Sequence, residues 1–151
     1  IFVLSKNVKK CASYHCDQHV VKMILESAQM LSTVCNLSGR KTEYQPAFRN
    51  HPCTKWVQKS LSNWIWLKSL ARELNNEFLN RYSHTAPHKS WTVISKLDEP
   101  KIDDVGLTPF VQAMPRKYRV KGDAVTAYRK YYLNEKTFAK WKLKNPYWWK
   151  K

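Results

Sequence analysis

The sequence predicts an all-α protein, a compact orthogonal helical bundle with one short N-terminal strand as an option. Two observations lead to this prediction. Apolar residues recur at helical spacing through two long segments, and no segment beyond the first four residues alternates as a strand would. With 151 residues, 43% of them apolar, the chain can bury a core without disulfides or metals. We therefore expect one basic domain over 1–151.

The first half of the chain is expected to form two long helices. The opening run 1–4 predicts a short strand or an extended edge, and Ser5 or Asn7 can cap the helix after it. A first long helix is predicted from about 13 to 34, ending before Gly39. After a polar loop, Pro52 suits the first position of a second helix of roughly 25 residues, because its missing N–H costs nothing there.

The second half predicts shorter helices. One or two helical turns are expected within 90–97. Thr108-Pro109 predicts a short helix over 110–113, which Pro115 closes. Asp123 is the expected cap of a last helix that runs towards residue 141, with a break near Asn134.

The charge of the chain indicates an anionic partner. Lys and Arg number 27 against 11 Asp and Glu, a formal net charge of +16, whereas about 2–8 is enough for the solubility of a small domain. The segment 114–151 holds 12 of the basic residues and two of the acidic ones. We expect DNA as the partner, with RNA as an alternative. An acidic protein or a membrane surface would also attract this charge. Because the basic segment is interleaved with Tyr and Trp and no lipidation motif is present, no membrane partner is expected.

The cysteines and the apolar segments indicate a soluble cytoplasmic protein. All four cysteines lie in the first third without a CxxC pair, which favours reduced thiols. No apolar stretch approaches the length of about 20 residues that a membrane span needs. Removal of an initiator Met normally leaves a small residue first, so we expect a few residues to precede Ile1.

Five polar residues recur at intervals of four, three, four and three along the first long helix. They are His15, His19, Lys22, Glu26 and Gln29. At 100° per residue they fall within about 80° of arc, while apolar residues occupy most of the remaining circumference. This polar stripe is the leading candidate for a catalytic site. The alternative is an ordinary solvated face in which Lys22 pairs with Glu26.

Metal binding is a weaker interpretation of the same residues. His15 and His19 have the i, i+4 spacing of metal ligands, and His51 or Cys53 could add a third ligand. The sequence has no HExxH motif and no second compact Cys/His cluster. We therefore predict no metal and no cofactor.

A second candidate site surrounds the expected helix start at Pro52. Free backbone N–H groups there, with the cations Arg49 and Lys55 and the imidazole of His51, could hold a phosphate. His51 also joins the catalytic candidates. The alternative is that His51 only caps the helix and Lys55 is solvated.

Further cations and rings are expected to contact nucleic acid, because cations hold phosphates while rings stack on bases. The predicted contact set is Arg49, Lys55, Arg81, His88, Lys89, Arg116, Lys117, Tyr118, Arg129, Lys130, Trp148 and Trp149. The alternative is that most of the rings belong to the core and that Trp148 and Trp149 pack as a C-terminal lid.

Several motifs together resemble a known group of proteins. These motifs are HCDQHVVKM at 15–23, His51-Pro52, Lys55-Trp56, QAMP at 112–115 and AYRKYY at 127–132. With them the chain resembles a family of small proteins encoded mainly by tailed bacteriophages and by some bacteria, over almost its whole length. This resemblance implies a phage setting, with the host cytoplasm as location, in which DNA metabolism is a common role.

The tail Tyr147-Trp148-Trp149-Lys150 and the basic, helical character are also similar to phage pyrimidine-dimer DNA glycosylases. Those enzymes use an N-terminal amine with a nearby Glu. Neither group can be matched residue by residue in this sequence, so the likeness is treated as an analogy.

The expected function is that of a phage-type DNA enzyme, either a glycosylase that excises a base or a metal-independent nuclease. In base excision, Glu26 or His19 would activate water or a nucleophile, and Lys22 would stabilise charge or form a Schiff base. The other stripe residues and His51 would orient the substrate. In the nuclease, His15 or His19 would pair with His51 as acid and base. The alternatives are a non-catalytic DNA- or RNA-binding protein and an inhibitor that docks on an acidic host protein.

Overall fold

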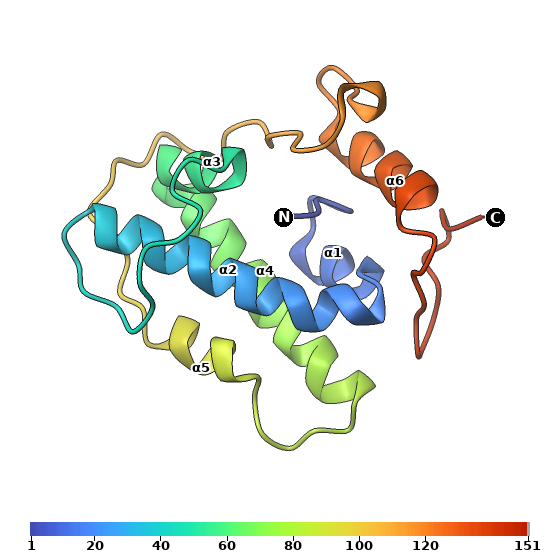
Figure 1. Ribbon diagram of the computed structural model, residues 1–151, viewed down its shortest axis with the longest axis horizontal. Coiled ribbons are helices and arrows are strands. Elements are labelled where there is room, and N and C mark those ends of the chain that lie inside the picture. Colours follow the sequence, from blue (N-terminus) through green and yellow to red (C-terminus); the bar gives the residue numbers. More distant parts are fainter. Residues whose placement is uncertain (151) are drawn as a thin grey trace.

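The structure is a computed structural model that describes residues 1–150. Within this range the chain forms six α-helices, one short 3-10 helix and no strand, which confirms the all-α class (Figure 1). The opening residues are extended. The elements in chain order are α1 (Val8–Tyr14), α2 (Asp17–Leu37), α3 (Pro52–Lys59), α4 (Leu61–Arg81), α5 (Lys89–Ser95), the 3-10 helix η1 (Arg116–Tyr118) and α6 (Ala124–Glu135).

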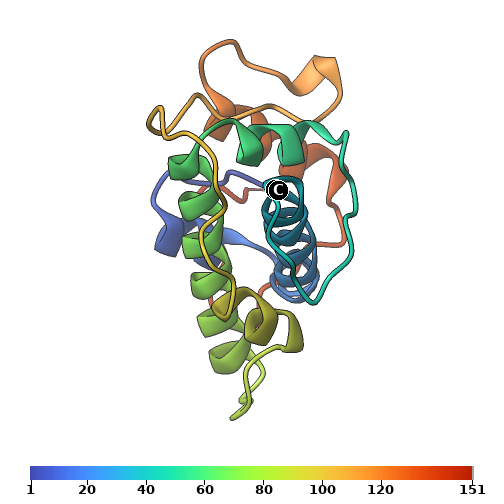
Figure 2. The same ribbon diagram turned by 90° about the vertical axis from the view of Figure 1, so that its left-hand side faces the viewer.

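The two long helices α2 and α4 form the centre of the bundle. They run in opposite directions in Figure 1 and lie side by side in Figure 2, with α3 across one end and α5 at the other. Their facing sides carry fully buried apolar residues such as Ile24, Leu31 and Leu67. Trp64 joins the two helices, because its indole is buried and donates to the carbonyl of Leu31 at 3.2 Å. This packing leaves one side of α2 free of core contacts.

The long helix predicted from about 13 to 34 begins only at Asp17, after the shorter helix α1, so the prediction that His15 lies on the long helix is wrong. His15 is extended and caps α1, and α2 starts only at Asp17. A side chain far away in the sequence stabilises this break. The buried guanidinium of Arg81 donates hydrogen bonds to the carbonyl oxygens of Ser13 at 3.0 Å and of His15 at 2.7 Å. A continuous helix would need these oxygens for its own ladder.

The second predicted helix is also divided, because α3 ends and α4 begins around an extended Ser60. No Gly or Pro marks this break. Asp104 accepts hydrogen bonds from Ser60 Oγ at 3.0 Å and from Ser62 Oγ at 2.6 Å, and the carbonyl of Asp103 accepts from Leu61 N at 3.0 Å. A loop from the second half of the chain thus satisfies the backbone where the helix is interrupted.

The short helix predicted over 110–113 is absent. Side chains take up the backbone groups of this segment instead, since Tyr128 donates to the carbonyl of Val111 at 2.7 Å and accepts from Ala113 N at 3.1 Å. The last helix ends at Glu135, which confirms the break predicted near Asn134, and it does not continue to residue 141. The cap by Asp123 is confirmed, because its carboxylate accepts from Thr126 N at 3.0 Å. The expected turns within 90–97 correspond to α5.

The four cysteines, at positions 11, 16, 35 and 53, are all free and buried. Over residues 1–150, no helix combines the length and the apolar character that crossing a membrane requires.

Candidate functional site

The exposed side of α2 carries the acidic and basic members of the polar stripe. The side chain of Lys22 is 68% exposed and that of Glu26 is 29% exposed, and Lys22 Nζ lies 3.9 Å from Glu26 Oε2. Gln29 is half-buried one turn further along. Because the ion pair is solvated it adds little to stability, so both charges remain available to a ligand.

His51 faces this carboxylate from the start of α3. It is the N-cap residue, and its Nδ1 accepts a hydrogen bond from Cys53 N at 3.0 Å. Burial lowers the pKa of His51 below its ordinary value, and the Glu26 carboxylate opposes this lowering. A neutral imidazole that accepts at Nδ1 carries its proton on Nε2. His51 can therefore donate a hydrogen bond from Nε2 to a substrate.

The N-terminal segment enters the bundle at this place. The nitrogen of Ile1 lies 3.9 Å from Cys53 Sγ, two residues beyond His51. Figure 1 shows the start of the chain in the space that α1, α2, α3 and α6 surround. The N-terminal segment and Glu26, which are far apart in the sequence, thus both lie close to the start of α3.

The two histidines that were predicted to be catalytic at the start of the stripe are buried. His15 has no exposed surface, its Nδ1 donates to the carbonyl of Cys11 at 2.7 Å, and burial lowers its pKa to about 3. His19 is 5% exposed, and burial together with the charges of two nearby lysines lowers its pKa to about 4. It stacks on Phe2 with ring centroids 4.5 Å apart and hydrogen-bonds Tyr132. These imidazoles hold the N-terminal segment in place and do not line the exposed face.

An exposed aromatic ring at the rim of the site escaped the sequence analysis. Phe48 is 52% exposed and has a φ of 55°, which is unusual for a bulky residue. The turn is fixed on both sides, because the carbonyl of Phe48 accepts from His51 N at 3.0 Å and Thr33 Oγ1 bonds to both N and O of Ala47 at 2.9 Å. The polar loop indicated a surface position, but only the structure shows that the turn carrying this ring is hydrogen-bonded to His51.

The predicted contact residues divide into exposed and buried sets. The exposed cations are Arg49, Lys55, Lys89, Arg116, Lys117 and Lys130. Two predictions need correction. Arg81 is 7% exposed and binds Asp17, Glu77 and backbone carbonyls, so its guanidinium holds helices together. Tyr118 is 8% exposed and donates to Glu135 at 2.6 Å. His88 caps α5, with Nδ1 accepting from Ser90 N at 3.0 Å.

The C-terminal aromatic residues pack as a lid against α1 and α6, the alternative that the sequence left open. Trp148 and Trp149 are half-buried, and the rings of both pack edge-on against the ring of Tyr132. Arg129 donates to the carbonyl of Leu4 at 3.0 Å and lies over the ring of Trp148, 5.5 Å from its centroid. These residues close one side of the bundle. Of Arg129, Trp148 and Trp149, only the solvent-exposed edges therefore remain available for the predicted contacts with nucleic acid.

In the part of the chain that the structure describes, no three His, Cys, Asp or Glu side chains come together as metal ligands. The fold and the site define a small, basic helical protein with a carboxylate, an amine-bearing side chain and a neutral imidazole on one exposed face. The family model for pyrimidine dimer DNA glycosylase matches residues 1–90. The chain therefore belongs to the pyrimidine dimer DNA glycosylase family. Neither the curated proteins nor the solved structures gave a match.

This result corrects the interpretation of the likeness to such enzymes as an analogy. The matched residues run from the N-terminal segment through α4 and include Lys22, Glu26, Phe48 and His51. The C-terminal basic segment, on which the sequence analysis based the likeness, lies outside the match. A Glu near the N-terminal segment could not be found by residue spacing, because 24 residues lie between Ile1 and Glu26 and only the fold places both of them near the start of α3.

Proposed function

We propose that this protein is a base-excision enzyme that cleaves the glycosidic bond of a pyrimidine dimer in DNA. The observation that carries the proposal is the half-buried Glu26 carboxylate, which has an amine 3.9 Å away and acts on the neutral imidazole of His51. The family match over residues 1–90 supports the same substrate class. The net charge of +16 supports DNA rather than a free base.

The proposed reaction uses an amine as nucleophile. The amine nitrogen forms a bond to C1′ of the sugar, the C1′–N bond to the base breaks, and one amine proton leaves with the base. The sugar ring then opens at C1′–O4′, and the oxygen takes up a proton as the imine forms. Glu26 would stabilise the positive charge that develops at C1′ and relay protons, which for general acid–base catalysis contributes about 10²–10⁴-fold. His51 Nε2 would donate to a flanking phosphate.

Two amines can serve this step. Lys22 Nζ is paired with Glu26, but its side chain is 68% exposed, whereas a Schiff-base lysine is normally activated by loss of solvent. The N-terminal segment also enters the site, and the α-amine at its head, which the residues expected before Ile1 would carry, is the second candidate. An α-amine has an ordinary pKa of about 8, well below that of lysine, so it is nucleophilic at neutral pH. We favour the α-amine, with Lys22 as an electrostatic partner of the reaction.

The burial of the first two histidines argues against the nuclease alternative. A general base must come within hydrogen-bond reach of the proton that it removes. His15 has no exposed surface and His19 is 5% exposed, so neither can reach a phosphodiester without rearrangement of the core.

Phe48 would assist extrusion of the damaged nucleotides. Enzymes that act on a base take it out of the stack, and apolar side chains inserted between base steps stabilise the opened duplex. Phe48 projects from a turn that is anchored at Thr33 and at His51. Its strained backbone conformation has a functional explanation if the ring must stand out from the surface.

The test is a duplex with a single pyrimidine dimer, end-labelled and analysed on a gel before and after alkali. We expect strand breaks or alkali-labile sites at the dimer, lost by about 10²–10⁴-fold in Glu26→Gln. Glu73→Gln, which removes a charge from α4, is the matched control and should keep full activity. An active Glu26→Gln variant would refute the role of Glu26. Salt-dependent binding without any bond broken would leave a DNA-binding protein that is not an enzyme.

Borohydride distinguishes the two amines. It reduces an imine to a stable secondary amine, so the trapped protein carries the sugar at the reacting nitrogen. We expect the modified peptide to be the N-terminal one and Lys22→Ala to remain trappable. Modification of the peptide that contains Lys22 would assign the nucleophile to the lysine.

A further inference from the structure

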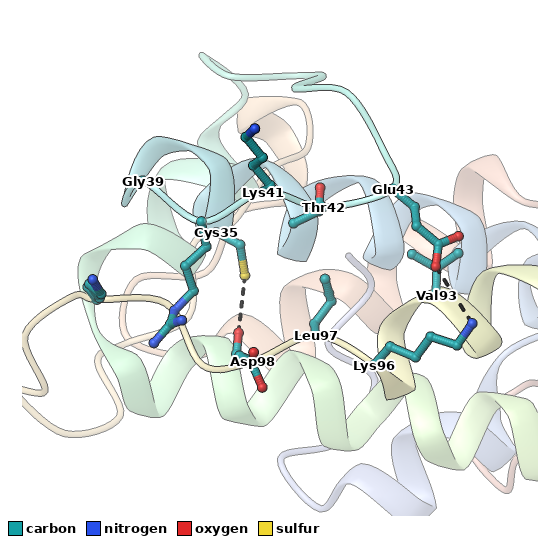
Figure 3. Close-up of a pocket in the computed structure, with 11 residues that line it drawn as sticks. Cys35, Gly39, Lys41, Thr42, Glu43, Val93, Lys96, Leu97 and Asp98 are labelled. Carbon is teal, nitrogen blue, oxygen red and sulfur yellow. Dashed lines mark hydrogen bonds and ion pairs between the residues drawn. The ribbon is translucent and has the colours of Figure 1, made fainter.

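A second basic site lies at the far end of α2 from the N-terminal segment. A cavity of about 530 Å³ opens between the turn that follows α2 and the turn that follows α5 (Figure 3). Val93 and Leu97 form an apolar side with the Cys35 thiol, and four cations lie around the opening, namely Arg40, Lys41, Lys96 and Lys101. Its volume lies in the range of ligand pockets, about 300–1,000 Å³.

The cavity is formed before any ligand binds, because the two turns are tied together. Gly39, with a φ of 93°, ends α2 in a left-handed turn, in which Arg40 N donates to the carbonyl of Cys35 at 3.0 Å and Gly39 N to that of Asn36 at 3.0 Å. Ser38 Oγ accepts from Lys101 N at 3.2 Å across the gap. Cys35 Sγ donates to the carbonyl of Asp98 at 3.5 Å, as Figure 3 shows. The hydrogen bonds of the turn after α2 therefore hold the backbone of Arg40 in place at the cavity.

The positive charges of this cavity are largely uncompensated. Among residues 1–150, Arg40, Lys41 and Lys101 have no side-chain hydrogen bond or ion pair, and Arg40 Nε is buried without a partner. Lys96 pairs with Glu43 at 3.7 Å, but both side chains are more than half exposed, so this pair is weak. Asp98 is the second carboxylate of the lining. A buried guanidinium nitrogen without an acceptor can accommodate an anionic ligand at little cost, because no existing hydrogen bond has to be broken.

The thiol does not supply the missing anion. Burial raises the pKa of Cys35 to about 11, so the thiol is neutral at physiological pH. Arginine is the side chain best suited to hold two oxygens of a phosphate, and lysines add charge without directional demands. The apolar side can contact a deoxyribose.

We propose that this cavity binds a backbone phosphate of the substrate DNA at a distance from the dimer. This inference rests on the proposed function. The loop 38–51 begins at the cavity and ends at His51, and α2 connects Glu26 to Cys35 through nine residues. At 1.5 Å per residue the two sites are separated by roughly 13 Å along the helix. The phosphates of one strand are about 3.4 Å apart along the duplex axis, so with α2 laid along that axis the bound phosphate would be roughly four nucleotides from the dimer.

The test removes the charges of the cavity and those of single phosphates in turn. The double variant Arg40→Gln/Lys101→Gln is compared with Lys9→Gln/Arg72→Gln, which removes two exposed cations from α1 and α4. We expect the cavity variant to bind the damaged duplex roughly tenfold more weakly and to lower the slope of log K against log salt by about 1. At saturating DNA its rate of base excision should be unchanged. Thermal melting of each variant checks that the fold is retained.

Methylphosphonate duplexes give the position. A neutral linkage placed one step at a time should weaken binding of the wild-type protein at one position, about four nucleotides from the dimer, and have no effect there in the cavity variant. Equal weakening of both double variants, or no sensitive position, would overturn the inference while base excision stands. Tight binding of a deoxynucleoside monophosphate that the cavity variant loses, with DNA binding unchanged, would also overturn it in favour of a free nucleotide. Loss of excision with the position-specific effect retained would refute only the proposed function.

Discussion

Arg81 is the residue on which the placement of the site depends most strongly. Its side chain is 2% exposed, and it joins the end of α4 to the junction between α1 and α2. It binds Asp17 Oδ1 at 3.1 Å and Glu77 Oε1 at 2.7 Å, together with carbonyl oxygens of the junction. We predict that Arg81→Met destabilises the protein and displaces the beginning of α2.

The magnitude follows from what the substitution leaves behind. Asp17 and Glu77 are 18% and 24% exposed, so two poorly solvated carboxylates would lose their common cation. Removal of one partner from such a buried pair costs about 3–5 kcal/mol, because the remaining charge is uncompensated. The carbonyls of Ser13 and His15 would also lose their donors. Arg81→Lys keeps the charge but not the planar fork, so we expect an intermediate loss.

Urea unfolding followed by circular dichroism measures the effect. The free energy of unfolding of Arg81→Met should fall by about 3–5 kcal/mol. Arg72→Met on the exposed side of the same helix is the control and should lie within about 0.5 kcal/mol of wild type. A loss below about 1 kcal/mol for Arg81→Met would refute the argument that this guanidinium holds the helix junction.

Two further predictions concern the buried histidines and the exposed ring. Burial lowers the pKa of His15 to about 3 and that of His19 to about 4, so the unfolded chain binds their protons first as the pH falls below about 6.5. The contribution of each histidine to the free energy of unfolding is therefore complete above that pH and should fall by about 2 kcal/mol between pH 7 and pH 5. In urea unfolding, the free energy of His19→Gln should depend less on pH than that of wild type. The control His84→Gln, at an exposed position, should show the same pH dependence as wild type. Replacement of Phe48 by Asn, which tolerates its positive φ, should leave the melting temperature unchanged or higher but lower excision of the dimer by at least tenfold. Unchanged excision in Phe48→Asn would exclude insertion of the ring into the duplex.

Local sequence signals were reliable where the cause of a structural feature is local. Asn7 and Asp123 cap their helices as predicted, because an N-cap needs only a short polar side chain two or three residues before its partner. Gly39 ends α2 for a similar reason, since a left-handed residue closes the last turn. The charged members of the stripe, Lys22 and Glu26, follow from helical spacing and lie on one exposed face.

Predictions failed where a distant group decides the backbone or the burial of a side chain. The breaks at His15 and Ser60 depend on Arg81 and on Asp104, which lie 66 and 44 residues further along the chain. His19 belongs to the stripe by periodicity, but Phe2 and Tyr132 cover it. Helical spacing identifies a polar face and gives no information about which part of that face another segment will occupy.

The helical class, the strong positive charge and the polar face of α2 follow from the residues alone, because each is a property of composition or of short-range periodicity. Which polar residues reach the surface, how the N-terminal segment comes close to the start of α3, and that Arg40 lines a cavity are visible only in the folded chain. The physical reason is that burial and electrostatic coupling depend on contacts between segments far apart in the chain, and such contacts form only when the helices pack.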